Sequence, residues 1–133
     1  MNFINLLFGQ NKNSGKRGYL ASLDKDQVKQ RWERIEELKL VDRPSALREA
    51  VIDADKLVDF SLGIIYQGRE GAADRLKEAK ALFVNQKEAY ENLWYAHKIR
   101  NEMVHTVGFE LPIMEAKNIL EIFQKALEII GAL

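Results

Sequence analysis

The chain of 133 residues has no cysteine, only two prolines and no excess of either charge. Without thiols there are no disulfides and no thiolate chemistry. A reducing compartment is compatible with this, and we expect a cytoplasmic location. No hydrophobic run approaches the roughly 20 residues needed to cross a bilayer. Because 20 Lys and Arg balance 20 Asp and Glu, no broad electrostatic field attracts nucleic acid, and any contact with RNA requires a local site.

The composition that remains, 47% hydrophobic and 30% charged residues, is typical of one folded globular domain. We expect this domain to span residues 23–133 and residues 1–22 to form a flexible tail. The tail begins with the apolar segment MNFINLLFG and continues with a basic one. A second interpretation is therefore a short interfacial anchor in which residues 1–17 contact a membrane surface. The small apolar area of this segment favours the simple tail.

Apolar residues recur at helical spacing along most of the chain, and no stretch alternates long enough to predict a strand. Five helical segments are predicted, over residues 24–40, 44–66, 72–83, 85–105 and 112–130. Asp24 is predicted to cap the first segment, and Asn85 with Glu88 resembles a capping box for the fourth. Gly108 suits a chain reversal after the fourth segment. Short connections favour antiparallel neighbours, so the predicted fold is all-α, an up-and-down bundle of four to five helices.

Chemically versatile side chains gather in the segment YAHKIRNEMVHTVGF, residues 95–109, which contains both histidines of the chain. Asn101 and His105 lie four residues apart on one side of the helix, and His97 extends the row. Arg100 is about 140° round the helix from His105 and roughly 7.5 Å away along the axis. Its long side chain can still reach round, and we expect Arg100 and His105 to share an open crevice.

This set of groups suits the cleavage of RNA by its own 2′-hydroxyl. Arginine binds two phosphate oxygens and stabilises the charge that grows on phosphorus. Histidine moves protons near neutral pH, and such a reaction needs neither a metal nor a cofactor. A single His105 does not easily serve as acid and base together, so a twofold homodimer would supply the second copy.

The run Arg100-Asn101-Glu102-Met103-Val104-His105 matches the R-x4-H motif of the HEPN superfamily, and the chain resembles that family over roughly residues 43–131. The resemblance implies a helical bundle, often a homodimer with facing motifs. It also implies a metal-independent endoribonuclease of the kind found in toxin–antitoxin and phage-defence systems, with RNA as substrate and an antitoxin as a further partner. By position, Arg100 would bind phosphate, His105 would be the acid and base, and Asn101 would orient the site.

The chain departs from the family in one place. Some family toxins have a tyrosine two residues after the histidine, where this chain has Val107. The modification of that tyrosine by a nucleotidyltransferase antitoxin is therefore not expected.

Other interpretations stay open from the sequence alone. Arg100 and His105 would also stabilise a helix C-terminus as cations, in a non-catalytic module that binds a partner protein or a nucleotide. Glu102 and His105 have the Glu-x-x-His spacing of di-iron bundles, although a second such pair is missing. His97 is expected at the surface or half-buried. Asp55 and Asp59 share a helix row and would repel each other unless a cation such as Arg100 lies close.

Overall fold

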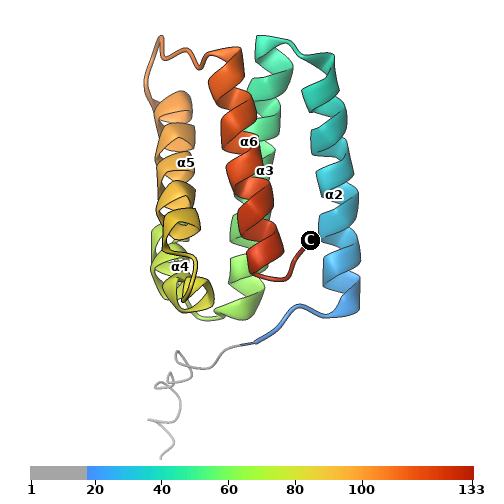
Figure 1. Ribbon diagram of the computed structural model, residues 1–133, viewed down its shortest axis with the longest axis vertical. Coiled ribbons are helices and arrows are strands. Elements are labelled where there is room, and N and C mark those ends of the chain that lie inside the picture. Colours follow the sequence, from blue (N-terminus) through green and yellow to red (C-terminus); the bar gives the residue numbers. More distant parts are fainter. Residues whose placement is uncertain (1–17) are drawn as a thin grey trace, which may run out of the picture.

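The computed structural model describes residues 18–133, so the predicted flexibility and membrane contact of residues 1–17 lie outside the described part. All regular structure in the described part is helical. Its elements are α2 (Ser22–Val41), α3 (Pro44–Ile65), α4 (Ala72–Glu78), the 3-10 helix η1 (Ala79–Phe83), α5 (Lys87–His105) and α6 (Ile113–Ile129). The four long helices run alternately up and down, and α4 lies at the lower end (Figure 1). This arrangement confirms the predicted all-α up-and-down bundle.

The centre of the bundle is formed by α3 and α6, which pack against each other. Each buries a stripe of side chains at helical spacing, which is what a core-facing helix requires. The buried side chains include Leu47, Val51, Ala54, Val58 and Leu62 from α3, and Ile119, Leu120, Phe123 and Leu127 from α6. Burial of one large apolar side chain contributes about 1.5–3 kcal/mol, so these two stripes supply much of the stability of the fold.

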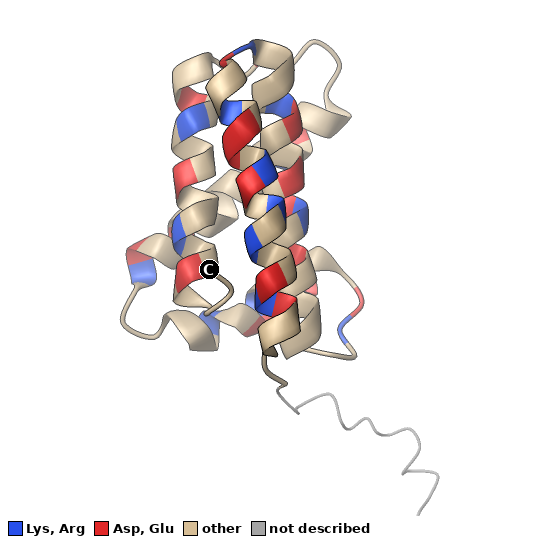
Figure 2. Cartoon of the chain, turned by 90° about the vertical axis from the view of Figure 1, so that its right-hand side faces the viewer, with Lys and Arg blue, Asp and Glu red and all other residues tan. Residues whose placement is uncertain are grey.

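The helix α2 covers one side of α3 and shows a narrower apolar stripe. Val28, Trp32, Ile35 and Leu38 are buried, while most of the intervening residues are exposed. Figure 2 shows acidic and basic residues interleaved along α2. The outer face of α2 therefore presents both signs of charge to solvent and no patch of a single sign.

Two predicted helix starts were wrong. The helix α2 begins at Ser22, before Asp24, and the Asp24 carboxylate accepts a hydrogen bond of 3.0 Å from the backbone N–H of Ala21. Asp24 therefore lies in the first turn of α2, and its side chain binds the backbone of the residue that precedes the helix. In the other case, Gln86 precedes α5, and Asn85 lies in the turn after η1. The Gln86 N–H closes that turn with a hydrogen bond of 2.9 Å to the Phe83 carbonyl. Asn85 therefore belongs to the turn and does not cap α5.

The chain that leads into α2 lies against the lower end of α3. The Gly18 N–H donates to the Ile65 carbonyl at 2.7 Å, and Leu20 is buried. A Cβ at position 18 would lie 2.9 Å from the Ile64 carbonyl oxygen, so this close approach requires glycine. The described part of the predicted 1–22 tail therefore contacts the bundle. Within residues 18–133, no helix is both long and apolar enough to cross a membrane.

Candidate functional site

The helix α5 positions all three predicted site residues. It buries Leu93, Ala96 and Met103 against the rest of the bundle. Because Arg100 lies seven residues after Leu93 and three before Met103, the same stripe turns its side chain toward the interior. His105 is the last residue of α5, two positions past Met103, and is exposed.

His97 is buried, so the expectation of a surface or half-buried position was wrong. It is only 7% exposed, and its Nδ1 lies 2.9 Å from Oδ1 of Asp55 on α3, which is 8% exposed. His97 also meets the Trp94 ring edge-on, with 6.1 Å between the centroids. The position follows from the helical period, since His97 comes four residues after the buried Leu93. A buried polar group requires a partner, and Asp55 supplies it.

Arg100 lies between Asp55 and Asn101. Its Nε is 3.3 Å from Asp55 Oδ2, and its Nη1 donates to Asn101 Oδ1 at 2.9 Å. The Nε–H does not align with the carboxylate well enough to form a hydrogen bond, so this contact is an ion pair. The sequence had suggested Arg100 as the cation that keeps Asp55 and Asp59 from repelling each other. Arg100 does lie at Asp55, whereas Asp59 is paired by a different arginine.

That arginine is Arg75 on α4. It donates from Nε to Asp59 Oδ1 at 2.7 Å and from Nη2 to Oδ2 at 3.0 Å. The hydrogen bond to Asp59 raises the pKa of Arg75 above its ordinary value, even though burial acts in the opposite direction. Each of the two carboxylates on this row of α3 therefore has its own guanidinium, one from α5 and one from α4.

A closed circuit of contacts joins four side chains. Asn101 Nδ2 lies 3.4 Å from His97 Nε2, which links the Asn101–Arg100 contact to the His97–Asp55 contact. Arginine only donates hydrogen bonds, so Asn101 must turn Oδ1 toward Arg100 and Nδ2 toward His97. His97 Nε2 is then the acceptor, and its proton lies on Nδ1 and is donated to Asp55. We refer to Asp55, His97, Arg100 and Asn101 as the polar ring.

His105 is not part of the polar ring. It makes no hydrogen bond or ion pair with residues 18–133, and no polar contact joins it to Arg100 there. The structure therefore brings Arg100 and Asn101 together, whereas His105 is exposed in the last turn without a polar contact to either of them. The crevice that Arg100 and His105 were expected to share stays a prediction. Sequence reasoning weighed Asp55 and His97 separately but missed their contact, because 42 positions separate them along the chain.

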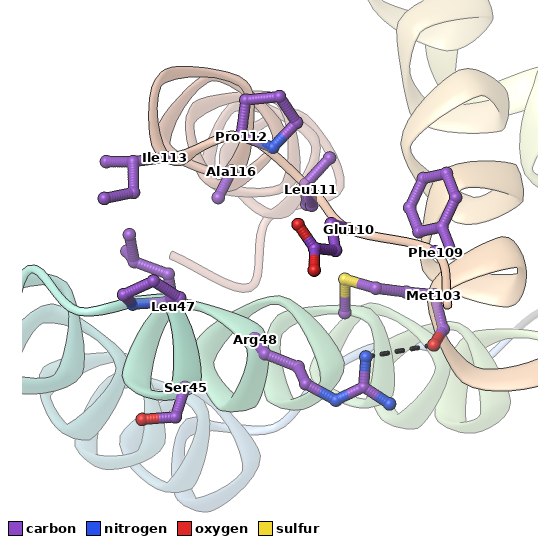
Figure 3. Close-up of a pocket in the computed structure, with 11 residues that line it drawn as sticks. Ser45, Leu47, Arg48, Met103, Phe109, Glu110, Leu111, Pro112, Ile113 and Ala116 are labelled. Carbon is purple, nitrogen blue, oxygen red and sulfur yellow. Dashed lines mark hydrogen bonds between the residues drawn. The ribbon is translucent and has the colours of Figure 1, made fainter. Parts of the chain in front are cut away.

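A groove of about 490 Å³ lies beside the end of α5, between the first turn of α3 and the loop that leads into α6. Its lining includes Leu47, Met103, Phe109 and Leu111, and neither Arg100 nor His105 lines it. Arg48 crosses the groove and donates from Nη1 to the Met103 carbonyl at 3.0 Å (Figure 3). Arg48 thus satisfies one of the carbonyls that the end of α5 leaves free.

Residues 18–133 contain no group of three or more His, Asp or Glu side chains placed to hold a metal ion. Glu102, the other half of the Glu-x-x-His spacing, accepts a hydrogen bond from the Thr106 hydroxyl at 3.0 Å. Comparison of the chain with family models, with curated proteins and with solved structures gives no match. Function is therefore argued from the residues and their geometry.

Proposed function

We propose that this protein is a HEPN-like, metal-independent endoribonuclease that acts as a homodimer in the cytoplasm, as a toxin or a defence component. Arg100 binds the phosphate, and His105 is the acid and base. The observation that carries the proposal is the polar ring. Its contacts hold Arg100 at Nε and Nη1 without burying the whole guanidinium. The Arg100 side chain is 22% exposed, and its Nη2 makes no hydrogen bond with residues 18–133.

The free part of the guanidinium suits a phosphodiester. Asp55 lies at Nε, and Asn101 takes one hydrogen of Nη1. The remaining hydrogens on Nη1 and Nη2 form an edge that can donate to two oxygens of one phosphate. In the reaction, the same edge stabilises the charge that develops on those oxygens as the 2′-hydroxyl attacks. Asn101, which contacts both Arg100 and His97, holds the orientation of this edge.

The charge of the site favours a dimer. Asp55 offsets the charge of Arg100 within one protomer, so a further cation is needed to hold a phosphate firmly. A second protomer would add an Arg100 and a His105 on the other side of a twofold axis. One imidazole then accepts the proton of the 2′-hydroxyl while the other protonates the leaving 5′-oxygen. An antitoxin would act by covering the paired Arg100 and His105 residues at the twofold axis.

The test is RNA cleavage in EDTA by the purified wild-type protein and by His105→Ala. We expect wild type to cut RNA and leave 2′,3′-cyclic phosphate ends, and the variant to be roughly 10²–10⁴-fold slower. The melting temperature should not change, because His105 is exposed and forms no polar contact with residues 18–133. Asn92→Ala on the same helix, also exposed, is the matched control and should cleave like wild type. Intact RNA after incubation with dimeric wild type would overturn the proposal.

The second candidate is a non-catalytic module of the same fold that binds a partner protein or a nucleotide. One observation favours it: Arg100 contacts Asp55 and Asn101 and has no polar contact with His105. Arg100→Ala does not separate the two functions, since it removes the cationic partner of the buried Asp55 carboxylate and lowers stability in either case. His105→Ala does separate the two functions, because His105 is exposed. In the non-catalytic module, His105→Ala changes neither RNA integrity nor melting temperature.

A further inference from the structure

We propose that Asp55 and His97 are positioning residues, which set the direction of the Arg100 guanidinium so that its Nη1–Nη2 edge is available to a phosphate. This inference rests on the proposed function and extends it to two residues that do not touch the substrate. Its basis is the polar ring, in which Asp55 contacts Arg100 directly and His97 contacts it through Asn101.

The first step is that Asp55 is held in place. More than nine-tenths of its surface is buried, and its two oxygens have separate partners, His97 Nδ1 on Oδ1 and Arg100 Nε on Oδ2. Rotation of the carboxylate would break one of these contacts in a site where water does not readily replace it. Asp55 therefore offers Arg100 one fixed anionic oxygen.

The second step is that His97 fixes the amide of Asn101. His97 is also more than nine-tenths buried, between Asp55 and the ring of Trp94. With its proton on Nδ1, its Nε2 accepts from Asn101 Nδ2, so Oδ1 of Asn101 must face Arg100. An arginine side chain has about 2 kcal/mol of rotamer entropy. Two contacts at different nitrogens remove much of that freedom before any substrate binds.

The alternative is that the polar ring only holds α5 against α3. The pair of Asp59 with Arg75 offers a matched control. Asp59 lies one helical turn after Asp55 on the same row of α3, and its pair joins α3 to α4. Asp55→Asn and Asp59→Asn remove the same charge from the same helix. Only the first of them leaves Arg100 without its anionic partner.

We therefore expect Asp55→Asn to lower kcat for RNA cleavage by about 100-fold, the scale of a misplaced catalytic group. Asp59→Asn should keep kcat within about twofold, with both variants assayed well below their melting temperatures. Unchanged kcat in Asp55→Asn would overturn the positioning role. An equal loss in both variants would do the same, since it would show that helix packing alone matters.

His97 allows a rescue experiment. A glutamine amide can donate to Asp55 and accept from Asn101, whereas leucine fills similar space without either ability. His97→Gln should keep most of the cleavage rate, and His97→Leu should fall to the level of Asp55→Asn. Equal activity in the two His97 variants would contradict the role of the hydrogen bonds.

A readout that does not need catalysis separates this inference from the proposed nuclease. The ¹⁵N NMR signal of the Arg100 Nε–Hε group, assigned by its loss in Arg100→Lys, should be dispersed and slow to exchange in the wild type. A 2′-O-methyl oligonucleotide, which has no nucleophile, should shift it. The signal should survive Asp59→Asn and His97→Gln and merge with those of free arginines in Asp55→Asn and His97→Leu.

The outcomes of this experiment are distinct. If wild type leaves RNA intact while Asp55→Asn and His97→Leu still lose the dispersed Arg100 signal, the nuclease proposal fails and the positioning of Arg100 is supported. If the Arg100 signal is the same in wild type and Asp55→Asn, the positioning itself is overturned, whatever the cleavage assay gives.

Discussion

Tyr95 joins α5 to α6 at the surface of the bundle. It is 43% exposed, and its hydroxyl donates to Glu115 Oε2 at 2.5 Å. This hydrogen bond raises the pKa of Tyr95, with smaller contributions in the same direction from burial and from the charge of Glu115. The bond stabilises the protonated phenol. Its contribution to stability is therefore complete below the ordinary tyrosine pKa of about 10 and is lost as the pH rises through the higher folded value.

The first prediction tests this contact by ultraviolet titration of the phenol. The difference between wild type and Tyr95→Phe isolates the titration of Tyr95, whose midpoint should lie above about 10. Glu115→Ala removes the acceptor and should bring the midpoint back toward that value. If the midpoint of Tyr95 is the same with and without the Glu115 carboxylate, the assigned cause is wrong.

The sequence was least informative about the contacts that individual site residues make. Periodicity shows which side of a helix faces inward, and it predicts neither the partner of an inward polar group nor its distance. Asp55 and Arg100 were considered as an ion pair, and the structure confirms their proximity. The burial of His97 against Asp55 was not predicted, since no local pattern relates residues that meet only through packing of α3 on α5.

At the scale of the elements, the turn after α5 depends on one backbone conformation. Gly108 has φ of 83°, in the left-handed region, and a Cβ there would meet nothing within 4 Å. Alanine at this position would therefore meet backbone strain alone, about 1–2 kcal/mol. Gly63 is the opposite case. It lies within α3 with no positive φ, and a Cβ there would make an ordinary contact of 3.8 Å with Arg75 Cδ.

The second prediction compares these two glycines. Gly108→Ala should lower the free energy of unfolding by about 1–2 kcal/mol, and Gly63→Ala should raise it by about 0.4–1 kcal/mol. Chemical denaturation measures both changes. A loss of equal size in the two variants would show that the conformation of Gly108 is not what decides the outcome.

Helix bounds were predictable to within two residues for most elements, and the exceptions have local causes. The segment predicted as one helix over residues 72–83 divides into α4 and the 3-10 helix η1 after Glu78. The division brings the Tyr90 hydroxyl within 2.8 Å of the Leu76 carbonyl, and the Phe83 and Tyr90 rings pack 5.4 Å apart. These contacts depend on the approach of α5, which the sequence of the segment does not encode.

At the scale of the whole molecule, the bundle has one continuous apolar core that runs through the long helices. Phe123 on α6 lies in this core with no exposed surface, whereas Met114 on the same helix is 78% exposed. The fold was predictable because each long helix has an apolar stripe of the correct period and the connections are short. A homodimer stays a prediction.

The third prediction follows from this core. Phe123→Ala should reduce the free energy of unfolding by about 3–5 kcal/mol, through lost burial and the cavity that remains. Met114→Ala should change it by no more than about 0.5 kcal/mol. Urea denaturation of both variants measures the difference. Similar midpoints for the two would contradict the placement of Phe123 at the centre.

The hydrogen bond from Gly18 to Ile65 fixes the first described residues of the chain against the bundle. This junction lies at the lower end in Figure 1, and the turn that follows His105 lies at the upper end. The two are separated by the length of α5, whose 19 residues span roughly 28 Å at the helical rise. A support coupled to the chain before Gly18 would therefore be tethered to the bundle at the end remote from His105, which suits capture experiments with RNA on immobilised protein.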